Sequence, residues 1–129
     1  MRVLIVDDSA TIRMILTGQL KKLGLTDVIE ASDGKAAIEI LAKHEVGLLL
    51  IDIHMPNMDG LSCLELIKTN PALAGIPVII VSSDTDPAQI ESAKSLGAHA
   101  YIRKPFRIEA LRDALSVAFP TQDFIGKNS

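Results

Sequence analysis

The stretch Gly47–Gly60, GLLLIDIHMPNMDG, decides the fold of this chain. Its apolar run Gly47–Ile51 is short and is closed by the acid Asp52, a pattern typical of a central strand buried on both faces of a sheet. Met55-Pro56 favours extended backbone before the proline, and Asp59-Gly60 supplies a helix cap or a tight turn. We therefore expect Asp52 to lie at the carboxyl end of a central strand, beneath a stiff loop.

On either side of this stretch, short apolar runs alternate with segments whose apolar residues recur at helical spacing. Strands are predicted at Arg2–Val6, Asp27–Ala31, Gly47–Ile51, Ile76–Val81 and His99–Ile102. Helices are predicted at Ala10–Leu23, from Gly34 to Lys43 or His44, at Leu61–Thr69, from Pro87 to Gly97 and at Ile108–Phe119. Strict alternation predicts a parallel sheet with helices on both faces, because parallel neighbours need right-handed crossovers. The predicted fold class is α/β: a doubly wound five-stranded parallel sheet, for which the strand order 2-1-3-4-5 is common.

Length and composition indicate one compact domain. The chain has 129 residues, of which 48% are hydrophobic and 22% charged, so we expect one domain over residues 1–120 and a short polar tail over residues 121–129. The net charge of −3 and the scattered Lys and Arg residues argue against a nucleic-acid surface. Asp7-Asp8 interrupts the first apolar run too early for a signal peptide or a membrane span. We expect a cytoplasmic protein without membrane insertion, in which the single cysteine, Cys63, is structural.

Polar residues stand where the predicted strands end. Asp7-Asp8 follows the first strand, Asp52 the third, Ser82 the fourth, and the fifth leads to Lys104. In the order 2-1-3-4-5 the first and third strands are neighbours at the switch point, where ligands bind outside the carboxyl ends. Three close carboxylates invite a cation, and Mg²⁺ prefers oxygen ligands of this kind. An ionised aspartate beside such a metal is a plausible nucleophile for phosphorus, with Lys104 and Ser82 placed to hold phosphoryl oxygens.

Each of these residues also has an ordinary structural interpretation. Asp7-Asp8 could only cap the first helix, and Ser82 could be a turn residue. Lys104 could be a solvated surface lysine, and Tyr101 could pack its ring while its hydroxyl meets water. Shared chemistry is favoured for Asp7-Asp8, Ser82 and Lys104, because they are expected with Asp52 at one edge of one sheet.

Four separated motifs, VDDSATIR, DIHMPNMDG, PVIIVSS and AYIRKPF, together resemble the receiver domain of bacterial two-component response regulators. The resemblance is greatest to the stand-alone chemotaxis (CheY-like) type and spans Arg2–Phe119. It implies a flavodoxin-like (βα)5 fold and a phosphorylated signalling protein rather than an enzyme that turns over an external substrate.

The resemblance also implies roles for particular residues. Asp52 would accept a phosphoryl group from the phosphohistidine of a sensor histidine kinase. Asp7, Asp8, Asp52 and the backbone carbonyl of His54 would hold Mg²⁺. Ser82 and Lys104 would contact the phosphoryl oxygens, and the residue matching Tyr101 changes rotamer in the family.

Further expectations follow from the same resemblance. The Lys104-Pro105 bond would be cis, and the side chains of His54 and Asp84 would tune the lifetime of the phosphoryl group. The output partner would read the face formed by the helix starting near Pro87, the fifth strand and the last helix. We expect a monomer or a weak phosphorylation-dependent dimer, acting in chemotaxis or motility signalling.

The alternatives that remain open lie within the family, and two others outside it are disfavoured by the sequence. The chain could be a receiver from a larger regulator or hybrid kinase, or a phosphate sink in a phosphorelay. A small aspartate-nucleophile phosphatase would want an Asp-x-Asp pattern, whereas Asp7 and Asp8 are adjacent. A flavin or dinucleotide site would want a glycine-rich loop after Val6, and the sequence has none there.

Overall fold

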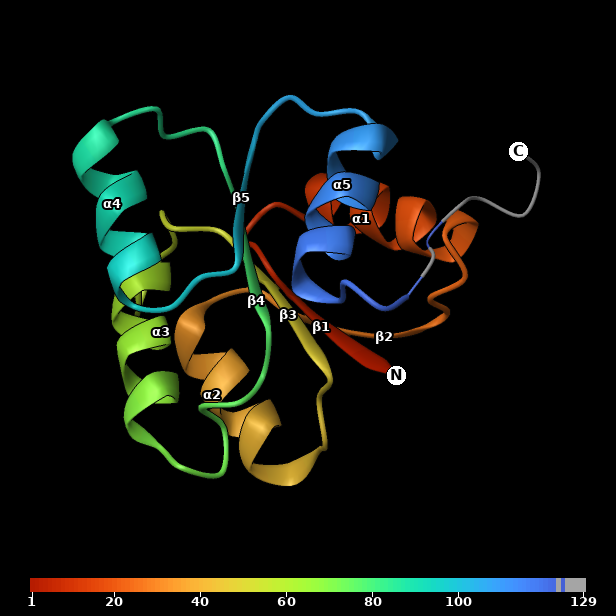
Figure 1. Ribbon diagram of the computed structural model, residues 1–129. Helices are drawn as coiled ribbons and strands as arrows, with labels where there is room; N and C mark the ends of the chain where they lie inside the picture. Colours follow the sequence, from red (N-terminus) through yellow and green to blue (C-terminus); the bar gives the residue numbers. More distant parts are fainter. Residues whose placement is uncertain (123, 125–129) are drawn as a thin grey trace.

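The computed structural model describes residues 1–122 and 124, in which five strands alternate with five helices (Figure 1). The strands are β1 (Arg2–Val6), β2 (Asp27–Ala31), β3 (Leu48–Ile51), β4 (Val78–Ser82) and β5 (Ala100–Arg103). The helices are α1 (Ala10–Lys22), α2 (Gly34–Lys43), α3 (Gly60–Thr69), α4 (Pro87–Ser95) and α5 (Ile108–Ala118). None of these helices combines the length and the apolar composition that crossing a membrane would require.

The strands form one parallel sheet in the order β2-β1-β3-β4-β5, which confirms the predicted fold class and order. Val6, the last residue of β1, lies beside Ala31 of β2 and Ile51 of β3. Ile51 in turn lies beside Ile80 of β4. This register brings the carboxyl ends of neighbouring strands to one edge of the sheet, so the residues that follow them meet there.

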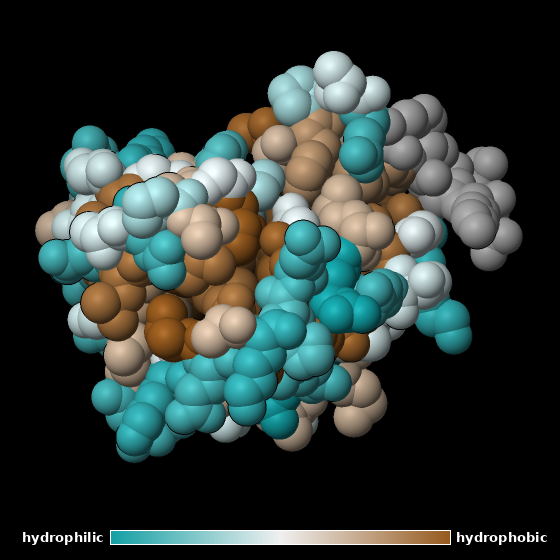
Figure 2. All heavy atoms as spheres, turned by 90° about the horizontal axis from the view of Figure 1, so that it is seen from below, coloured by the Kyte–Doolittle hydropathy of each residue, from teal (hydrophilic) through white to brown (hydrophobic). Residues whose placement is uncertain are grey.

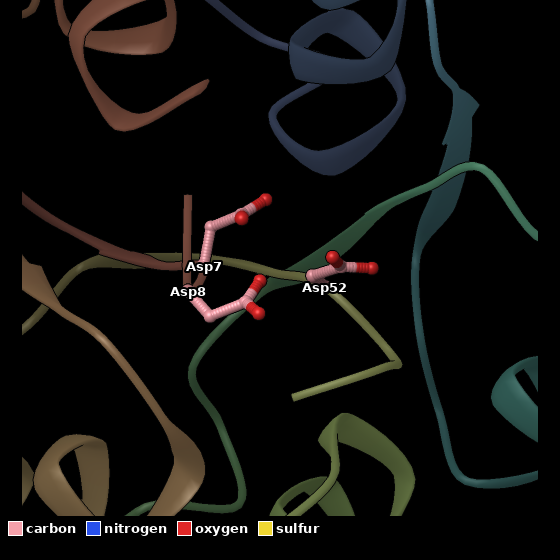
Figure 3. A group of neighbouring side chains, drawn as sticks. All are labelled: Asp7, Asp8 and Asp52. Carbon is pink, nitrogen blue, oxygen red and sulfur yellow. The ribbon is translucent and has the colours of Figure 1, made fainter. Parts of the chain in front are cut away.

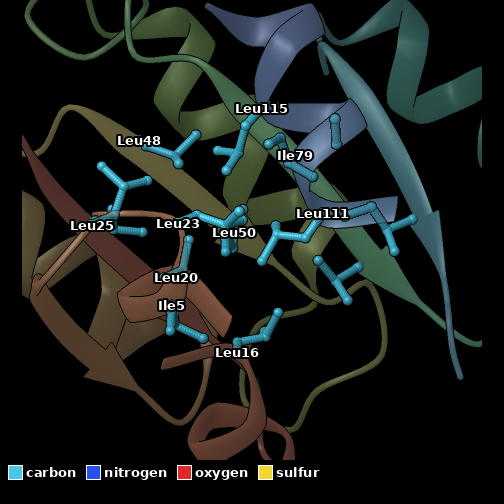
Figure 4. Close-up of a cluster of buried hydrophobic side chains, with 14 of the residues drawn as sticks. Ile5, Leu16, Leu20, Leu23, Leu25, Leu48, Leu50, Ile79, Leu111 and Leu115 are labelled. Carbon is cyan, nitrogen blue, oxygen red and sulfur yellow. The ribbon is translucent and has the colours of Figure 1, made fainter. Parts of the chain in front are cut away.

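Two helical layers cover the sheet, with α1 and α5 on one face and α2, α3 and α4 on the other (Figure 1). Side chains at alternate positions of β1, β3 and β4 enter opposite layers, because successive strand residues point to opposite faces. The α1/α5 layer (Figure 4) contains Val3, Ile5, Leu16, Leu20, Leu48, Leu50, Ile79, Leu111 and Leu115. Each fully buried aliphatic side chain contributes roughly 1.5–3 kcal/mol, so these layers supply most of the stabilisation.

Helix ends follow local sequence signals. Ser9, Asp33, Asp59 and Asp86 cap the starts of α1, α2, α3 and α4, and each accepts a backbone N–H with its side chain. These contacts satisfy donors that the first helical turn leaves unpaired. Gly97, with φ of +91°, follows the end of α4 in the left-handed conformation that glycine adopts without strain.

Several boundaries differ from the predicted ones by one or two residues. β4 begins at Val78 instead of Ile76 and extends through Ser82, which pairs with Arg103 of β5. Pro77 precedes the ladder because proline has no N–H to donate, although its carbonyl accepts from Leu49. The α4 helix ends at Ser95, because the chain turns before Gly97.

Part of the predicted tail is described. Phe124 is buried, and its ring lies 6.1 Å from that of Phe119 between centroids. Residues 123 and 125–129 of the predicted tail lie outside the described residues.

Candidate functional site

Three aspartates meet at the carboxyl edge of the sheet (Figure 3). Asp7 and Asp8 follow β1, and Asp52 follows β3; one carboxylate oxygen from each lies within 4.8 Å of the others. Asp7 and Asp52 are buried, whereas Asp8 is exposed. We call this group of three aspartates the acidic pocket; its solvent-exposed member is Asp8.

Lys104, which follows β5, contacts both of the buried acids. Its Nζ donates to Asp7 Oδ2 at 2.7 Å and to Asp52 Oδ2 at 3.0 Å. Burial alone would lower the pKa of Lys104, but the bonds to Asp7 and Asp52 outweigh it and raise the pKa. The ammonium is therefore charged at neutral pH and neutralises part of the acid cluster. The Lys104-Pro105 bond is cis, which confirms the prediction.

The Asp7 carboxyl is held tightly. Its Oδ1 accepts from the backbone N–H of Ser9 at 2.8 Å, while its Oδ2 meets Lys104. Burial nevertheless raises the pKa of Asp7 above its usual value, and the contacts with Lys104 and Ser9 offset this only in part. The ionised form of Asp7 is thus costly in the folded protein, and additional positive charge in the pocket would relieve that cost.

The loop after Asp52 is fixed from both ends. Asp52 Oδ1 accepts from the backbone N–H of Ile53 at 2.7 Å. A side chain at Gly60 would collide with the carbonyl oxygen of Asp52, so only glycine permits this approach of α3 to the acid. Asn57, with φ of +66°, donates to Asp33 Oδ2 at 2.6 Å and ties the loop to the start of α2.

Ser82, Asp84 and Tyr101 form a connected group beside the pocket. Ser82 is fully buried at the end of β4, and its Oγ accepts from the backbone N–H of Asp84 at 3.2 Å. The Tyr101 hydroxyl donates to the carbonyl of Asp84 at 2.8 Å. Burial raises the pKa of Tyr101, so this hydroxyl remains a donor at neutral pH. The loop after β4 therefore connects Ser82 with Tyr101.

The His54 side chain points to Asp84. Its Nε2 lies 2.6 Å from Asp84 Oδ2, and the ring remains 61% exposed. The backbone N–H of Asp86 and the contact with His54 lower the pKa of Asp84. The sequence singled out both residues but gave no sign that they pair, because they are 30 positions apart.

The donor set of the pocket fits a hard divalent cation. It offers carboxylate oxygens from three aspartates and no sulfur or imidazole nitrogen within the cluster, as far as residues 1–122 and 124 are concerned. Zinc sites usually use those softer ligands, whereas Mg²⁺ takes oxygen from one or two carboxylates. Three carboxyl groups also face a single ammonium, that of Lys104, so the group has more acids than cations to pair with them.

The opposite end of the sheet shows a different surface. A hollow of about 710 Å³ lies there between the starts of β1 and β3 and the loop before β4, and it includes Arg2, Gly47 and Ile76. Seen from below, this side of the molecule carries an apolar area bordered by hydrophilic residues (Figure 2). The Arg2 guanidinium is paired with Asp27 at 3.2 Å. The hollow lies at the amino ends of the strands, whereas the three aspartates lie at the carboxyl ends, so the two features are separate.

Comparison with known proteins identifies the family. The sequence model of one protein family, the response regulator receiver domain, matches residues 3–116. The chain belongs to this family. Among its relatives, a probable chemotaxis protein CheY of Rhizobium etli is 36% identical over 118 residues, which cover 92% of each chain. The chemotaxis protein CheY1 of Helicobacter pylori is 36% identical over 124 residues, which cover 95% of this chain and all of the relative.

Solved structures place the receiver among proteins of two kinds. The chemotaxis protein CheY4 of Vibrio cholerae matches with a TM-score of 0.84 and 28% identity, over 92% of this chain and 98% of the other. A signal receiver domain of a histidine kinase from Syntrophus aciditrophicus matches with a TM-score of 0.83 and 28% identity, over 94% and 92%. The receiver fold is therefore shared with both stand-alone chemotaxis proteins and receivers of kinases.

The receiver brings together most residues that the sequence singled out, and adds one that it did not. Asp7, Asp8, Asp52 and Lys104 gather in the pocket. Arg13 was missed, although its Nη1 donates to the carbonyl oxygen of Asp7. Its position on α1, six residues after Asp7, was the available signal, but an arginine there could equally have faced solvent.

Proposed function

We propose that this receiver accepts a phosphoryl group from a sensor histidine kinase onto Asp52 and thereby controls a protein partner. The observation that carries the proposal is the pocket itself: Asp7, Asp8 and Asp52 offer oxygens within 4.8 Å of one another, and Lys104 bridges two of them. The protein would act as a cytoplasmic signalling regulator that is controlled by its own phosphorylation, and not as an enzyme that turns over an external substrate.

The transfer step makes one bond and breaks one. A carboxylate oxygen of Asp52 attacks phosphorus, the phosphorus–nitrogen bond of the phosphohistidine breaks, and the nitrogen keeps the bonding pair and takes up a proton. Asp52 suits this role because its carboxylate lies at the strand end, and its Oδ1 is oriented by the N–H of Ile53. Little else is required beyond in-line positioning and neutralised equatorial oxygens.

Other groups of the pocket hold the incoming charge. Bound Mg²⁺, held by Asp7, Asp8, Asp52 and the backbone carbonyl of His54, would neutralise phosphoryl oxygens. Lys104 would exchange its contact with Asp52 Oδ2 for one with a phosphoryl oxygen, since its ammonium already lies 3.0 Å from the acceptor. Ser82 would donate its hydroxyl to another oxygen.

The signal to the partner would begin with a movement of Ser82 toward the phosphoryl group. Its hydroxyl presently accepts from the N–H of Asp84, whose carbonyl is bound by Tyr101. A shift of Ser82 toward the phosphoryl group would therefore pull the loop that carries Asp84 and bias the rotamer of Tyr101. The partner would read the face of α4, β5 and α5, where a hollow lined by Tyr101, Phe106 and the exposed Val117 supports docking.

The test of the acceptor is Asp52→Asn. This variant keeps the shape of the side chain but removes the nucleophilic carboxylate, so labelling by radioactive acetyl phosphate with Mg²⁺ should fall to background. Asp59→Asn is the matched control, because Asp59 lies on the same loop but only caps α3. Undiminished labelling of Asp52→Asn would refute the assignment.

We also infer that His54 and Asp84 influence the lifetime of the phosphoryl group. The contact between His54 Nε2 and Asp84 Oδ2, at 2.6 Å, joins the loops after β3 and β4. We expect the loss of this contact in His54→Ala to change the access of water to Asp52, and with it the rate of dephosphorylation, at least severalfold. His44→Ala, an exposed histidine at the end of α2, serves as the control. Equal decay of His54→Ala and wild type at several pH values would end this inference.

The second candidate is a receiver belonging to a larger regulator or hybrid kinase, or a phosphate sink. The likeness to the signal receiver domain of a histidine kinase from Syntrophus aciditrophicus supports this second candidate. The 36% identity to chemotaxis proteins along nearly their whole length favours the chemotaxis role. A pull-down with beryllofluoride-treated and untreated protein distinguishes them: a flagellar or motility protein retained only by the treated form supports chemotaxis, whereas a phosphotransfer protein supports a relay.

A further inference from the structure

We propose that Arg13 is a positioning residue that sets the directions of the Asp7 and Asp8 carboxylates, and thereby the affinity of the pocket for Mg²⁺. The inference rests on the proposed function, because it concerns the same metal site. It starts from a contact of the main chain: Arg13 Nη1 donates to the carbonyl oxygen of Asp7 at 2.6 Å.

The Asp7 main chain is fixed on both sides by this contact. Its N–H donates to the carbonyl of Ala31 in β2 at 3.1 Å, and its own carbonyl is held by Arg13 from α1. The peptide between Asp7 and Asp8 is planar, so a fixed carbonyl also fixes the direction of the Asp8 N–H. The orientation of that plane limits where the Asp8 side chain can leave the backbone. Arg13 therefore acts on both acids without touching either carboxylate.

A second contact orients the guanidinium. Arg13 Nε donates to Glu30 Oε1 at 2.9 Å, and Glu30 lies on β2 beside Ile5 of β1. The Arg13 side chain is 18% exposed and that of Glu30 46%, so solvent weakens the ion pair. Its main consequence is geometric: one planar fork reaches two acceptors on different elements, which a lysine ammonium on a flexible stem does less well.

Geometry and charge predict opposite results when Arg13 is removed. As a nearby cation, Arg13 repels Mg²⁺, so its loss would strengthen metal binding if charge alone mattered. As a support for the ligands, its loss would weaken metal binding, as is general for groups that orient metal-binding residues. The sign of the change therefore separates positioning from simple electrostatics.

The experiment is a calorimetric titration of the unphosphorylated full chain with MgCl₂. Arg13→Met keeps an apolar stem but has no donor, and should weaken Mg²⁺ binding about tenfold. Arg13→Lys keeps the charge but carries all its donors on one nitrogen, so it should bind Mg²⁺ more weakly than wild type but more tightly than Arg13→Met. Lys22→Met removes the same charge from the exposed last turn of α1 and should leave the affinity unchanged.

Two readouts keep the proposal separate from other failures. The melting temperature without Mg²⁺ reports whether Arg13 only attaches α1 to the sheet. In that case the Arg13 variants would melt at a lower temperature but bind Mg²⁺ with wild-type affinity, and this result would overturn the proposal. Equal or tighter Mg²⁺ binding by Arg13→Met also overturns it. If Arg13→Met does not fold, Arg13→Lys decides, and wild-type affinity of that variant refutes the inference. Wild-type protein that binds no Mg²⁺ overturns the metal site of the proposed function together with this inference.

Discussion

Replacing Lys104 by methionine tests the electrostatic description of the pocket. The change keeps the length of the stem but leaves Asp7 and Asp52 without the ammonium that lies 2.7 and 3.0 Å from them. Breaking a fully buried ion pair costs roughly 3–5 kcal/mol. Here the Lys104 side chain is 15% exposed and Asp7 can take up a proton, so we expect the free energy of unfolding to fall by about 2–3 kcal/mol.

This loss should depend on Mg²⁺. For a domain of this size a loss of 2–3 kcal/mol corresponds to a fall of about 10 °C in melting temperature without the metal. A ligand present at 100 times its Kd stabilises a protein by about 2.7 kcal/mol, which is similar to the expected loss. Because the acids of Lys104→Met lack their internal cation, Mg²⁺ should stabilise this variant more than wild type and narrow the difference.

The assay is thermal unfolding by circular dichroism, with EDTA and with a series of MgCl₂ concentrations. Arg103→Met is the matched control, since Arg103 is the exposed neighbouring cation at the end of β5 and the net charge changes equally. It should shift the melting temperature little, and equally with and without Mg²⁺. The reasoning would be wrong if Lys104→Met were as stable as wild type in EDTA, or if its deficit were the same at every Mg²⁺ concentration.

Two other predictions use the direction of pKa shifts. Burial raises the pKa of Asp7 in the folded state, so the protein loses stability as the pH rises from the unfolded pKa of 3.8 through the raised folded pKa. The stability of Asp7→Asn relative to wild type, measured by urea unfolding without Mg²⁺, should therefore increase with pH. A difference in stability that does not depend on pH would contradict this prediction. Burial raises the pKa of the Cys63 thiol to about 12, so iodoacetamide at pH 8 should modify Cys63 only after unfolding, and rapid modification of the native protein would show that α3 opens readily.

The sequence determined the layers of this protein and the edge at which its chemistry gathers. Apolar runs such as Leu48–Ile51 have the period and length of buried strands, and the helical spacing between them requires parallel crossovers. Once the strands are parallel, Asp7, Asp8, Asp52 and Lys104 follow their carboxyl ends and must approach one another. Element bounds were less certain, as with β4 at Ile76–Pro77, because the end of a ladder depends on the neighbouring strand.

Only the tertiary structure decided which atoms meet. Periodicity assigns a side chain to a face but not to a rotamer, so it could not show that His54 turns to Asp84 or that Arg13 reaches the carbonyl of Asp7. It also could not show that Lys104 divides its ammonium between Asp7 and Asp52. These contacts join residues far apart in the chain, and their geometry depends on how the helices and loops pack around the sheet, which no local pattern encodes.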